Sequence, residues 1–353
     1  MISNKPFNVV AFGSPVVDVS NYVDQAFLTK HSIKKGEALI TETHENAFIN
    51  EIQAMEGTKI TLGGSAMNTL RAFNWAVKSQ KDTVFSKMCS GFADDGFAKI
   101  IKDGLKNANV GYIAEEKSNA FSPRCGCGIF EKDRSMVCYI GGVQKYSEEF
   151  FAKNFEEISN FDLLILEGYY LTCDVEKIKK LIQHAEDNTK IVASSISSEF
   201  VAHCFTEPLK FVIQKSDFVF SNLKEAQAWA QAVNLDAKEN GIEIAIETCK
   251  KYKKASSKEK IFVITHDEKP VTVVHYSYEK DEVLLAKEFE LPIQMTMDQI
   301  EDTNGAGDTF MGTFLAGKVL GKSFEECLKV SNYASSLVLK KVGCDHPLEE
   351  NLY

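Results

Sequence analysis

A run of small residues that ends in a carboxylate is the part of this sequence best suited to chemistry. It covers residues 302–308, with the sequence DTNGAGD, and leads into an apolar segment with helical spacing. Small residues let backbone N–H groups approach an anion closely, here at Gly305, Ala306 and Gly307, and a helix start adds its positive dipole end. Asp308 stands where a general base is needed, so the run suits phosphoryl transfer to a hydroxyl. A turn capped by one of its two aspartates is the alternative interpretation.

A second glycine turn precedes another segment with helical spacing. Gly63 and Gly64 are followed by Ser65 and, one helical turn later on the same face, by Asn68. The glycines let a ligand reach the backbone, and the two polar side chains can bond to hydroxyl groups. A helix whose first turn is capped by Ser65, without any ligand, explains the same residues.

One carboxylate interrupts an apolar strand near the start of the chain. Asp18 lies within residues 16–19, among three valines. An ionised carboxylate is costly to bury unless it is paired or hydrogen-bonded. Asp18 therefore either faces solvent from an edge strand or accepts hydrogen bonds from the hydroxyls of a polyol.

Asn222 and Glu225 follow a predicted strand and open a predicted helix. Asn at the start of a helix with Glu three residues later is the pattern of a capping box. The functional alternative is a magnesium site in which both residues hold the ion through its waters, since Mg²⁺ keeps several waters when bound to protein.

Composition limits the class of protein. The 353 residues are 44% hydrophobic and 25% charged, as in ordinary globular proteins, with a formal net charge of -10. This charge argues against binding nucleic acid or acidic lipid through the overall field. No segment is apolar enough to span a membrane. Nine scattered cysteines predict free thiols in the cytoplasm, and the C-x-C of Cys125 and Cys127 has no second pair to make a metal site.

The elements that must position these residues alternate between strand and helix. Strands are expected at residues 8–12, 83–89, 163–166, 191–194, 218–221 and 261–265, with helical segments between them. This order predicts an α/β fold, a Rossmann-like three-layer arrangement with a mostly parallel sheet and helices on both faces.

A β-rich insertion is expected beside that sheet. Residues 121–130 and 135–140 alternate like a hairpin that turns at residues 131–134. Together with residues 15–43 they predict a small discontinuous β-sheet that forms a lid over a pocket. The predicted large domain covers residues 1–14, 46–112 and 145–353, and the predicted lid covers residues 15–45 and 113–144.

These motifs occur in the order found in the ribokinase-like (PfkB) carbohydrate and nucleoside kinases, which the chain resembles over nearly its whole length. Within that family it is most similar to the nucleoside kinases that phosphorylate adenosine. The supporting matches outside the motifs above lie at residues 13–20, 133–135, 168–172, 332–336 and 343–344. The resemblance implies a ribokinase-like fold and a monomeric purine-salvage enzyme that transfers the γ-phosphate of MgATP to the 5′-hydroxyl of adenosine, giving AMP and ADP.

The resemblance also implies a role for each site residue. Asp308 would be the base toward the 5′-hydroxyl, the backbone of residues 305–307 would stabilise the transferring phosphoryl group, and Arg134 on the lid would close over it. The other positions follow from the same resemblance: Ser14, Asp18, Gly63, Gly64, Ser65, Asn68, Cys125 and Tyr170 for the nucleoside, Asn222, Thr265 and Asn332 for ATP, and Asn222 with Glu225 for Mg²⁺ through water.

Three positions depart from the family pattern. Ser14 stands where Asn is common, Ser195 stands where Asn or Asp is common, and Asp267 stands where a Thr-x-Gly turn has its glycine. A negative charge at Asp267 close to the ATP phosphates would cost roughly 1 kcal/mol or more. Two alternatives therefore stand beside the adenosine kinase activity: a kinase for another sugar or nucleoside, and a binding or structural protein with little catalysis.

Overall fold

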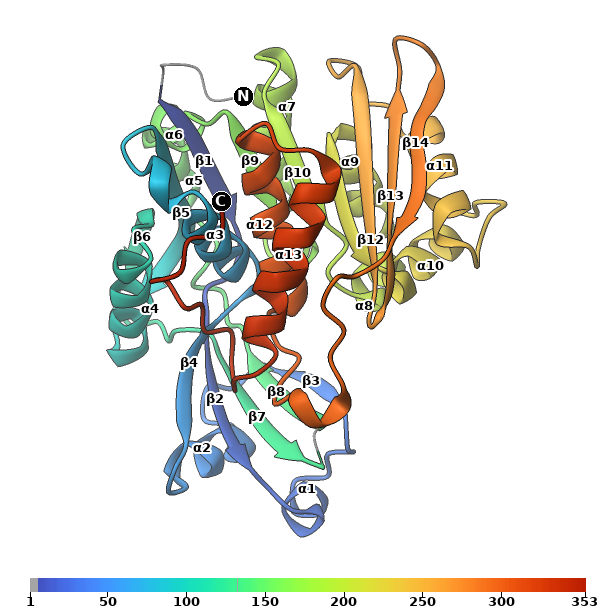
Figure 1. The fold of residues 1–353 in the computed structure, drawn as a ribbon. Helices are drawn as coiled ribbons and strands as arrows, with labels where there is room; N and C mark the ends of the chain where they lie inside the picture. The colour runs from blue at the N-terminus through green and yellow to red at the C-terminus, as the bar shows by residue number, and fades with distance from the viewer. Residues whose placement is uncertain (1–5, 132) are drawn as a thin grey trace.

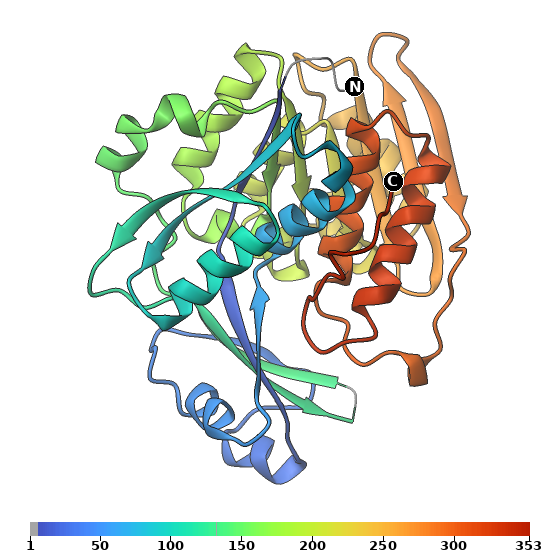
Figure 2. The ribbon, with the colours of Figure 1, turned by 60° about the vertical axis from the view of Figure 1, so that its left-hand side comes forward.

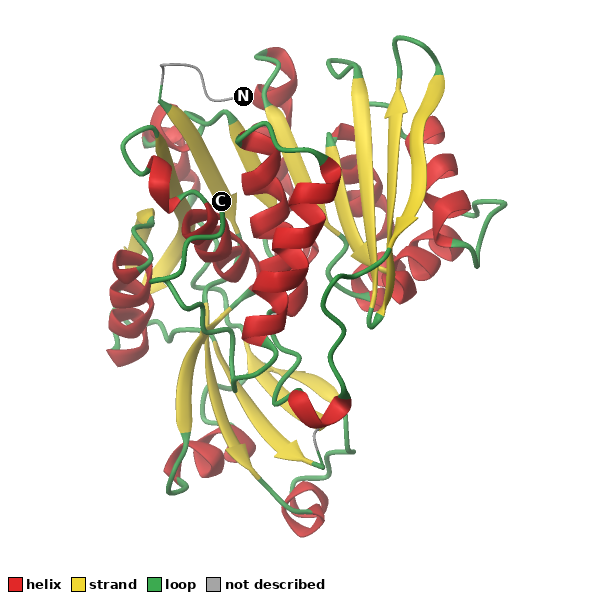
Figure 3. Cartoon of the chain, viewed as in Figure 1, coloured by secondary structure: helices red, strands yellow, loops and turns green. Residues whose placement is uncertain are grey.

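The computed structural model describes residues 6–131 and 133–353, which form two β-sheets with helices around the larger one (Figures 1 and 3). The large sheet has nine strands in the order β14-β13-β12-β11-β10-β9-β1-β5-β6. Its strands are β1 (Phe7–Phe12), β5 (Val84–Ala93), β6 (Gly111–Lys117), β9 (Leu163–Leu166), β10 (Ile191–Ser195), β11 (Phe218–Asn222), β12 (Glu259–His266), β13 (Lys269–Ser277) and β14 (Glu282–Phe289).

Strand pairing in the large sheet is parallel from β6 to β12 and antiparallel for the β12–β13 and β13–β14 pairs. The α/β fold with a mostly parallel sheet is therefore confirmed. All six predicted strands are present, with bounds close to those expected. The antiparallel pair β13 and β14 was not among the predicted elements.

Helices cover both faces of the large sheet and create two hydrophobic cores. Successive strand residues point to opposite faces, so Val10 and Phe12 of β1 enter one core while Val9 and Ala11 enter the other. The first core is closed by α5 (Glu148–Lys153), α6 (Phe155–Ile158), α7 (Val175–Asp187), α8 (Glu199–Cys204), α9 (Thr206–Lys215), α10 (Leu223–Ala232) and α11 (Gly241–Lys251). The second is closed by α3 (Ser65–Ala76), α4 (Gly96–Asn107), α12 (Ala306–Val319) and α13 (Phe324–Val338).

The small sheet extends from one end of the large domain (Figure 2). Its five strands have the order β3-β8-β7-β2-β4. They are β2 (Val16–Tyr22), β3 (Ala38–Thr41), β4 (Lys59–Gly63), β7 (Arg124–Phe130) and β8 (Asp133–Tyr139), and they are accompanied by α1 (Gln25–Lys30) and α2 (Ala47–Ala54). The predicted hairpin is present as the antiparallel pair β7 and β8.

Three elements join a different sheet or core from the one that the predicted domain boundaries gave them. Strand β4 pairs with β2, and Phe48, Ile49 and Ile52 of α2 pack in the small core, so both elements belong to the lid rather than to the large domain. Strand β6, which was assigned to the lid, pairs with β5 in the large sheet. Periodicity indicates strand or helix but not which sheet a strand joins, and the boundaries were wrong for that reason.

Two of the cysteines are not free thiols. Cys125 and Cys138 lie opposite each other on β7 and β8 and form a disulfide, while seven cysteines of the described part are free. The prediction of free thiols was wrong for this pair because a cross-strand neighbour cannot be identified from scattered spacings. Among the described residues, no helix is long and apolar enough to cross a membrane.

Close packing of α3 on α12 offers a test of the fold. A Cβ atom at Gly312 would lie 2.2 Å from the backbone oxygen of Thr69. We expect Gly312→Ala to lower the free energy of unfolding by about 1–3 kcal/mol, the usual range for overpacking. Urea denaturation measures this change.

Gly96→Ala is the matched control. Gly96 is the first residue of α4, and a Cβ there would meet no atom within 4 Å. Alanine at that position should leave stability unchanged or raise it by about 0.4–1 kcal/mol. Equal effects of the two substitutions would contradict the proposed role of the α3–α12 contact.

Candidate active site

The first turns of α3 and α12 meet at the carboxylate of Asp308. The hydroxyl of Ser65 donates to Oδ1 at 2.6 Å, and the amide Nδ2 of Asn68 donates to Oδ2 at 3.0 Å. Burial raises the pKa of Asp308, while the two hydrogen bonds oppose that rise. The capping interpretation of Ser65 is wrong, because no side chain caps α3 and the Ser65 hydroxyl is directed to Asp308.

The start of α12 has the features of an anion cradle. Gly305 precedes the helix with a φ of 74°, in the left-handed region that favours glycine, and no side chain caps the first turn. A Cβ at Gly307 would meet no atom within 4 Å, so this side of the turn faces open space. The backbone here fits an anionic group such as a phosphate, and Asp308 does not cap its own helix.

Asp18 is buried and faces the same site. Strand β2 lies between β7 and β4, so Asp18 is not on an edge strand, and Nδ2 of Asn304 donates to its Oδ2 at 2.7 Å. Burial raises the pKa of Asp18 to about 6, although the positive charge of Arg134 lowers it in part. A Cβ at Gly63 would lie 2.6 Å from the Asp18 carboxylate, so glycine at that position makes room for the acid.

Arg134, on β8 of the lid, contacts residues 302–308, which we name the candidate catalytic turn. Its Nε lies 3.1 Å from Oδ1 of Asp302 in an ion pair, and Nη2 donates to the hydroxyl of Ser20 at 3.1 Å. Its buried Nη1 has no hydrogen-bond partner among the described residues. Arg134 therefore keeps a donor for an anionic ligand between lid and core.

Glu167 was missed by the sequence reasoning. It follows β9, is buried, and accepts hydrogen bonds at 2.8 Å from the backbone N–H groups of both Ser14 and Ala66. Burial raises the pKa of Glu167 to about 7. One side chain thus joins the β1–β2 turn to the start of α3. The available signal was an acid directly after a buried parallel strand, where ligand sites gather.

The same two turns touch directly at Gly64. This residue has a φ of 92°, and a Cβ there would lie 2.2 Å from the backbone oxygen of Ser14. Both features require glycine. Ser14 is buried and lies against the start of α3, and its contact with the nucleoside stays a prediction.

Asn222 and Glu225 form the predicted capping box at the start of α10. Asn222 accepts from the backbone N–H of Glu225 at 2.8 Å, and the carboxylate of Glu225 accepts from the backbone N–H of Asn222 at 3.1 Å. Burial raises the pKa of Glu225 to about 7, and the negative charge of Asp308 adds to this rise. The structural interpretation is confirmed, and magnesium binding stays a prediction.

The residues expected near ATP lie on separate elements. Thr265 is the second-last residue of β12, and its hydroxyl donates to the backbone oxygen of Ser221 at 3.4 Å. The Ser195 hydroxyl lies 2.8 Å from that of Ser197. Asn332 of α13 bonds to both backbone groups of Ile293, at 2.7 Å and 3.1 Å, so its side chain holds a loop.

Tyr170 and Cys125, both predicted to contact the nucleoside, lie in different surroundings. Tyr170 is fully buried, and its hydroxyl donates to the backbone oxygen of Gln144 at 3.2 Å, so it packs in the core. Cys125 is buried in the disulfide, and its Sγ lies within 4.8 Å of a carboxylate oxygen of Asp18, so its contact with the nucleoside stays a prediction. The neighbouring Tyr169 is 44% exposed, so it is the tyrosine of this segment whose side chain reaches the surface.

The sequence pattern of the pfkB family carbohydrate kinases matches residues 35–351. The chain belongs to this family. It is 27% identical to adenosine kinase 2 of Arabidopsis thaliana over 98% of this chain and 97% of that protein, and 26% identical to adenosine kinase of Saccharomyces cerevisiae over 98% of each. The fold matches Anopheles gambiae adenosine kinase in complex with P1,P4-di(adenosine-5) tetraphosphate, with a TM-score of 0.84 and 22% identity over 97% of this chain and 98% of that one.

The two hydrogen bonds to Glu167 lead to a prediction. Glu167→Gln keeps the size of the side chain but replaces one acceptor oxygen by an amide donor, so one backbone N–H loses its acceptor. We expect kcat/KM for the phosphoryl acceptor to fall about tenfold or more, because the two turns are no longer held together. Steady-state kinetics measures the change.

The pH dependence of stability is the accompanying control. Because the pKa of Glu167 rises from 4.5 to about 7 on folding, the folded state binds a proton more tightly in this interval. The Glu167 contribution to the free energy of unfolding therefore falls as pH rises through it, and the glutamine variant lacks this contribution. Urea denaturation at several pH values should show different slopes for the two proteins, and equal slopes would contradict the assignment.

Proposed function

We propose that this protein transfers the γ-phosphoryl group of ATP to the 5′-hydroxyl of adenosine, producing AMP and ADP. The observation that carries the proposal is the Asp308 carboxylate, held by Ser65 and Asn68 at the uncapped start of α12. A base and an anion cradle within one helical turn suit phosphoryl transfer, which depends on positioning and electrostatics. The adenosine kinases of Arabidopsis and yeast, similar along their whole length, support adenosine as the acceptor.

In this proposal each side chain acts on a defined part of the acceptor. Asp308 removes the proton from the 5′-hydroxyl as the phosphoryl group arrives, and its raised pKa brings it closer to neutral pH, which favours a general base. The ionised Asp18 carboxylate accepts from the vicinal hydroxyls of ribose. Gly63 makes room for the Asp18 carboxylate, and Gly64 makes room for the backbone of Ser14, so both glycines help to position the groups that hold the sugar.

In this proposal, backbone groups make most of the contacts to the phosphate groups of the ligand. N–H groups of residues 305–307 stabilise the charge on the phosphoryl oxygens, and Arg134 covers them from the lid, which excludes water. Mg²⁺, when bound through water to Glu225 and Asn222, would neutralise charge on the ATP phosphates.

We further propose that the enzyme works as a monomer in the cytoplasm, within purine salvage.

A panel of acceptors combined with Asp308→Asn tests the proposal. With MgATP, adenosine should give faster turnover than guanosine, ribose or fructose. Asp308→Asn should lower kcat about 10²-fold to 10⁴-fold with an unchanged melting temperature, because it removes the base and keeps the side-chain volume. A coupled assay for ADP measures both. Turnover with another acceptor but not adenosine would overturn the substrate, and full activity of the variant would overturn the role of Asp308.

Asp267 raises the alternative of a binding protein with weak catalysis. It lies exposed at the turn between β12 and β13, with a φ of 51°, the left-handed conformation that a glycine adopts easily. We place this turn beside the ATP phosphates, where its charge opposes binding. Asp267→Asn removes the charge and tolerates the conformation. We expect the KM for ATP to fall about fivefold, equivalent to roughly 1 kcal/mol.

Asp267→Gly tests whether the left-handed backbone at this position, as well as the charge, affects the KM for ATP. Glycine removes both the charge and the cost of the left-handed backbone, so it should lower the KM for ATP at least as much as asparagine does. Steady-state kinetics at saturating adenosine measures both variants. An unchanged KM in both would show that Asp267 lies away from the phosphates.

A further inference from the structure

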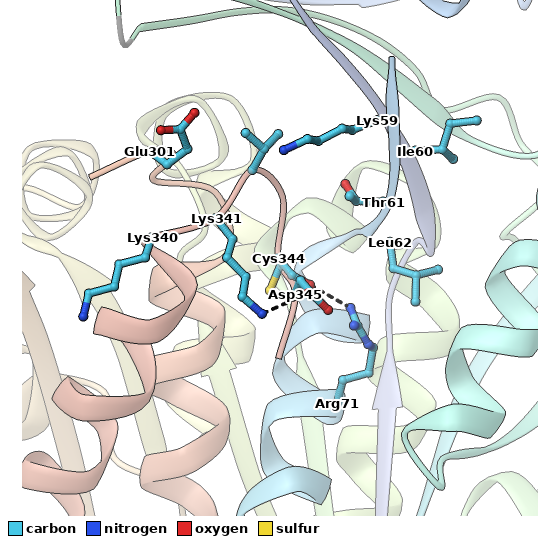
Figure 4. Close-up of a pocket in the computed structure, with 11 residues that line it drawn as sticks. Lys59, Ile60, Thr61, Leu62, Arg71, Glu301, Lys340, Lys341, Cys344 and Asp345 are labelled. Atoms are coloured by element: carbon cyan, nitrogen blue, oxygen red, sulfur yellow. Dashed lines mark hydrogen bonds and ion pairs between the residues drawn. The ribbon is translucent and has the colours of Figure 1, made fainter. Parts of the chain in front are cut away.

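A cavity separate from the candidate catalytic turn lies between the lid and the end of α13 (Figure 4). Its volume of about 700 Å³ is within the range of small-molecule pockets, roughly 300–1,000 Å³. Strand β4 forms one wall, and the segment after α13 forms the other. Asp18, Ser65, Asn68 and Asp308 do not line it.

Positive charge prevails in this cavity although the protein as a whole carries -10. Its charged lining residues are the cations Lys59, Arg71, Lys340 and Lys341 and the anions Glu301 and Asp345. Both anions already have partners: Asp345 pairs with Lys341 at 3.2 Å, and Glu301 accepts from the hydroxyl of Tyr22. Lys59 and Lys340 have no acidic partner within 4 Å among the described residues. Two unpaired cations thus border the cavity.

Buried polar atoms without partners also line the cavity. Arg71 is only 6% exposed; its Nη1 donates to the backbone oxygen of Cys344 at 3.2 Å, but its Nε has no hydrogen-bond partner among the described residues. The buried hydroxyl oxygen of Thr61 likewise has none. Figure 4 shows Arg71 rising from α3 toward Cys344 and Asp345, below Thr61. Buried polar groups are nearly always satisfied. Arg71 Nε and the Thr61 hydroxyl are therefore free to bond to a ligand in this cavity.

We propose that this cavity binds a small anion with two or more negative charges. Lys59 and Lys340 supply long-range attraction from opposite walls, and the guanidinium of Arg71 with the Thr61 hydroxyl supplies the buried contacts. Phosphate esters and polycarboxylates share this chemistry. The proposal does not depend on the proposed adenosine kinase activity, since Asp18, Ser65, Asn68 and Asp308 do not line the cavity. The two sites are neighbours, because Nη1 of Arg71 also donates to Oδ1 of Asn68 at 3.5 Å.

The cavity wall is bonded to the candidate catalytic turn. The backbone N–H of Gly343 donates to Oδ2 of Asp302 at 2.6 Å, and that of Glu301 donates to the backbone oxygen of Leu339 at 2.8 Å. Asp302 is also the partner of Arg134 on the lid. A ligand that changes the position of this wall therefore acts on the contact between lid and core.

Calorimetric titration of the full chain without divalent metal tests the proposal, with inorganic pyrophosphate and citrate as probes. At least one of them should bind the wild type, and Lys59→Gln with Lys340→Gln should weaken that binding tenfold or more. If only pyrophosphate binds, the ligand is a phosphate ester; if only citrate binds, it is a polycarboxylate. If both bind, the site selects its ligand by charge alone.

The matched control is Lys99→Gln with Lys329→Gln, which removes two exposed lysines outside the cavity. This control should keep the wild-type affinity, and both double variants should keep the wild-type melting temperature and turnover without added anion. Equal affinities of the two double variants would overturn the proposal. Absence of binding of either probe to the wild type at millimolar concentration would do the same.

Discussion

The Asp308 carboxylate, shared between Ser65 and Asn68, is the interaction on which the rest of the site depends. These residues come from α3 and α12, more than 200 positions apart, and the carboxylate can be reached only because the two helices begin at the same edge of the sheet. Glycine at position 312 lets the helix axes approach closely. The base of the proposed reaction is thus positioned by helix packing, and changes far from the acceptor can affect it.

Acidic groups dominate the site before any ligand enters. Burial raises the pKa of Asp18, Glu167, Asp308 and Glu225, and the negative charge of Asp308 adds to the rise at the other three. Arg134 is the positive group that lowers the pKa of Asp18 in this cluster. Such a concentration of acids with perturbed pKa values is typical of functional sites. It also explains why the phosphates are expected to rely on backbone N–H groups, a helix start and a metal ion.

The lid is joined to the large domain by polar contacts at the candidate catalytic turn. Arg134 pairs with Asp302, Asn304 donates to Asp18, and the hydroxyl of Tyr22 donates to Glu301. Polar contacts of this kind can be exchanged for contacts to a ligand at small net cost in free energy. The cavity beside β4 shares Glu301 with these contacts.

The sequence by itself determined the fold class, most strand bounds and the residue types of the site. Hydrophobic periodicity is local, and the Gly305–Asp308 and Gly63–Asn68 runs carry their chemistry within a few residues. Tertiary structure decided which partners these residues have. It directed Ser65 to Asp308 instead of its own helix, buried Tyr170 while exposing Tyr169, and paired Cys125 with Cys138. It also places Glu167 between the backbones of Ser14 and Ala66 and pairs β4 with β2 of the small sheet. Contacts between distant segments depend on strand order and helix packing, and no local pattern in one sequence encodes them.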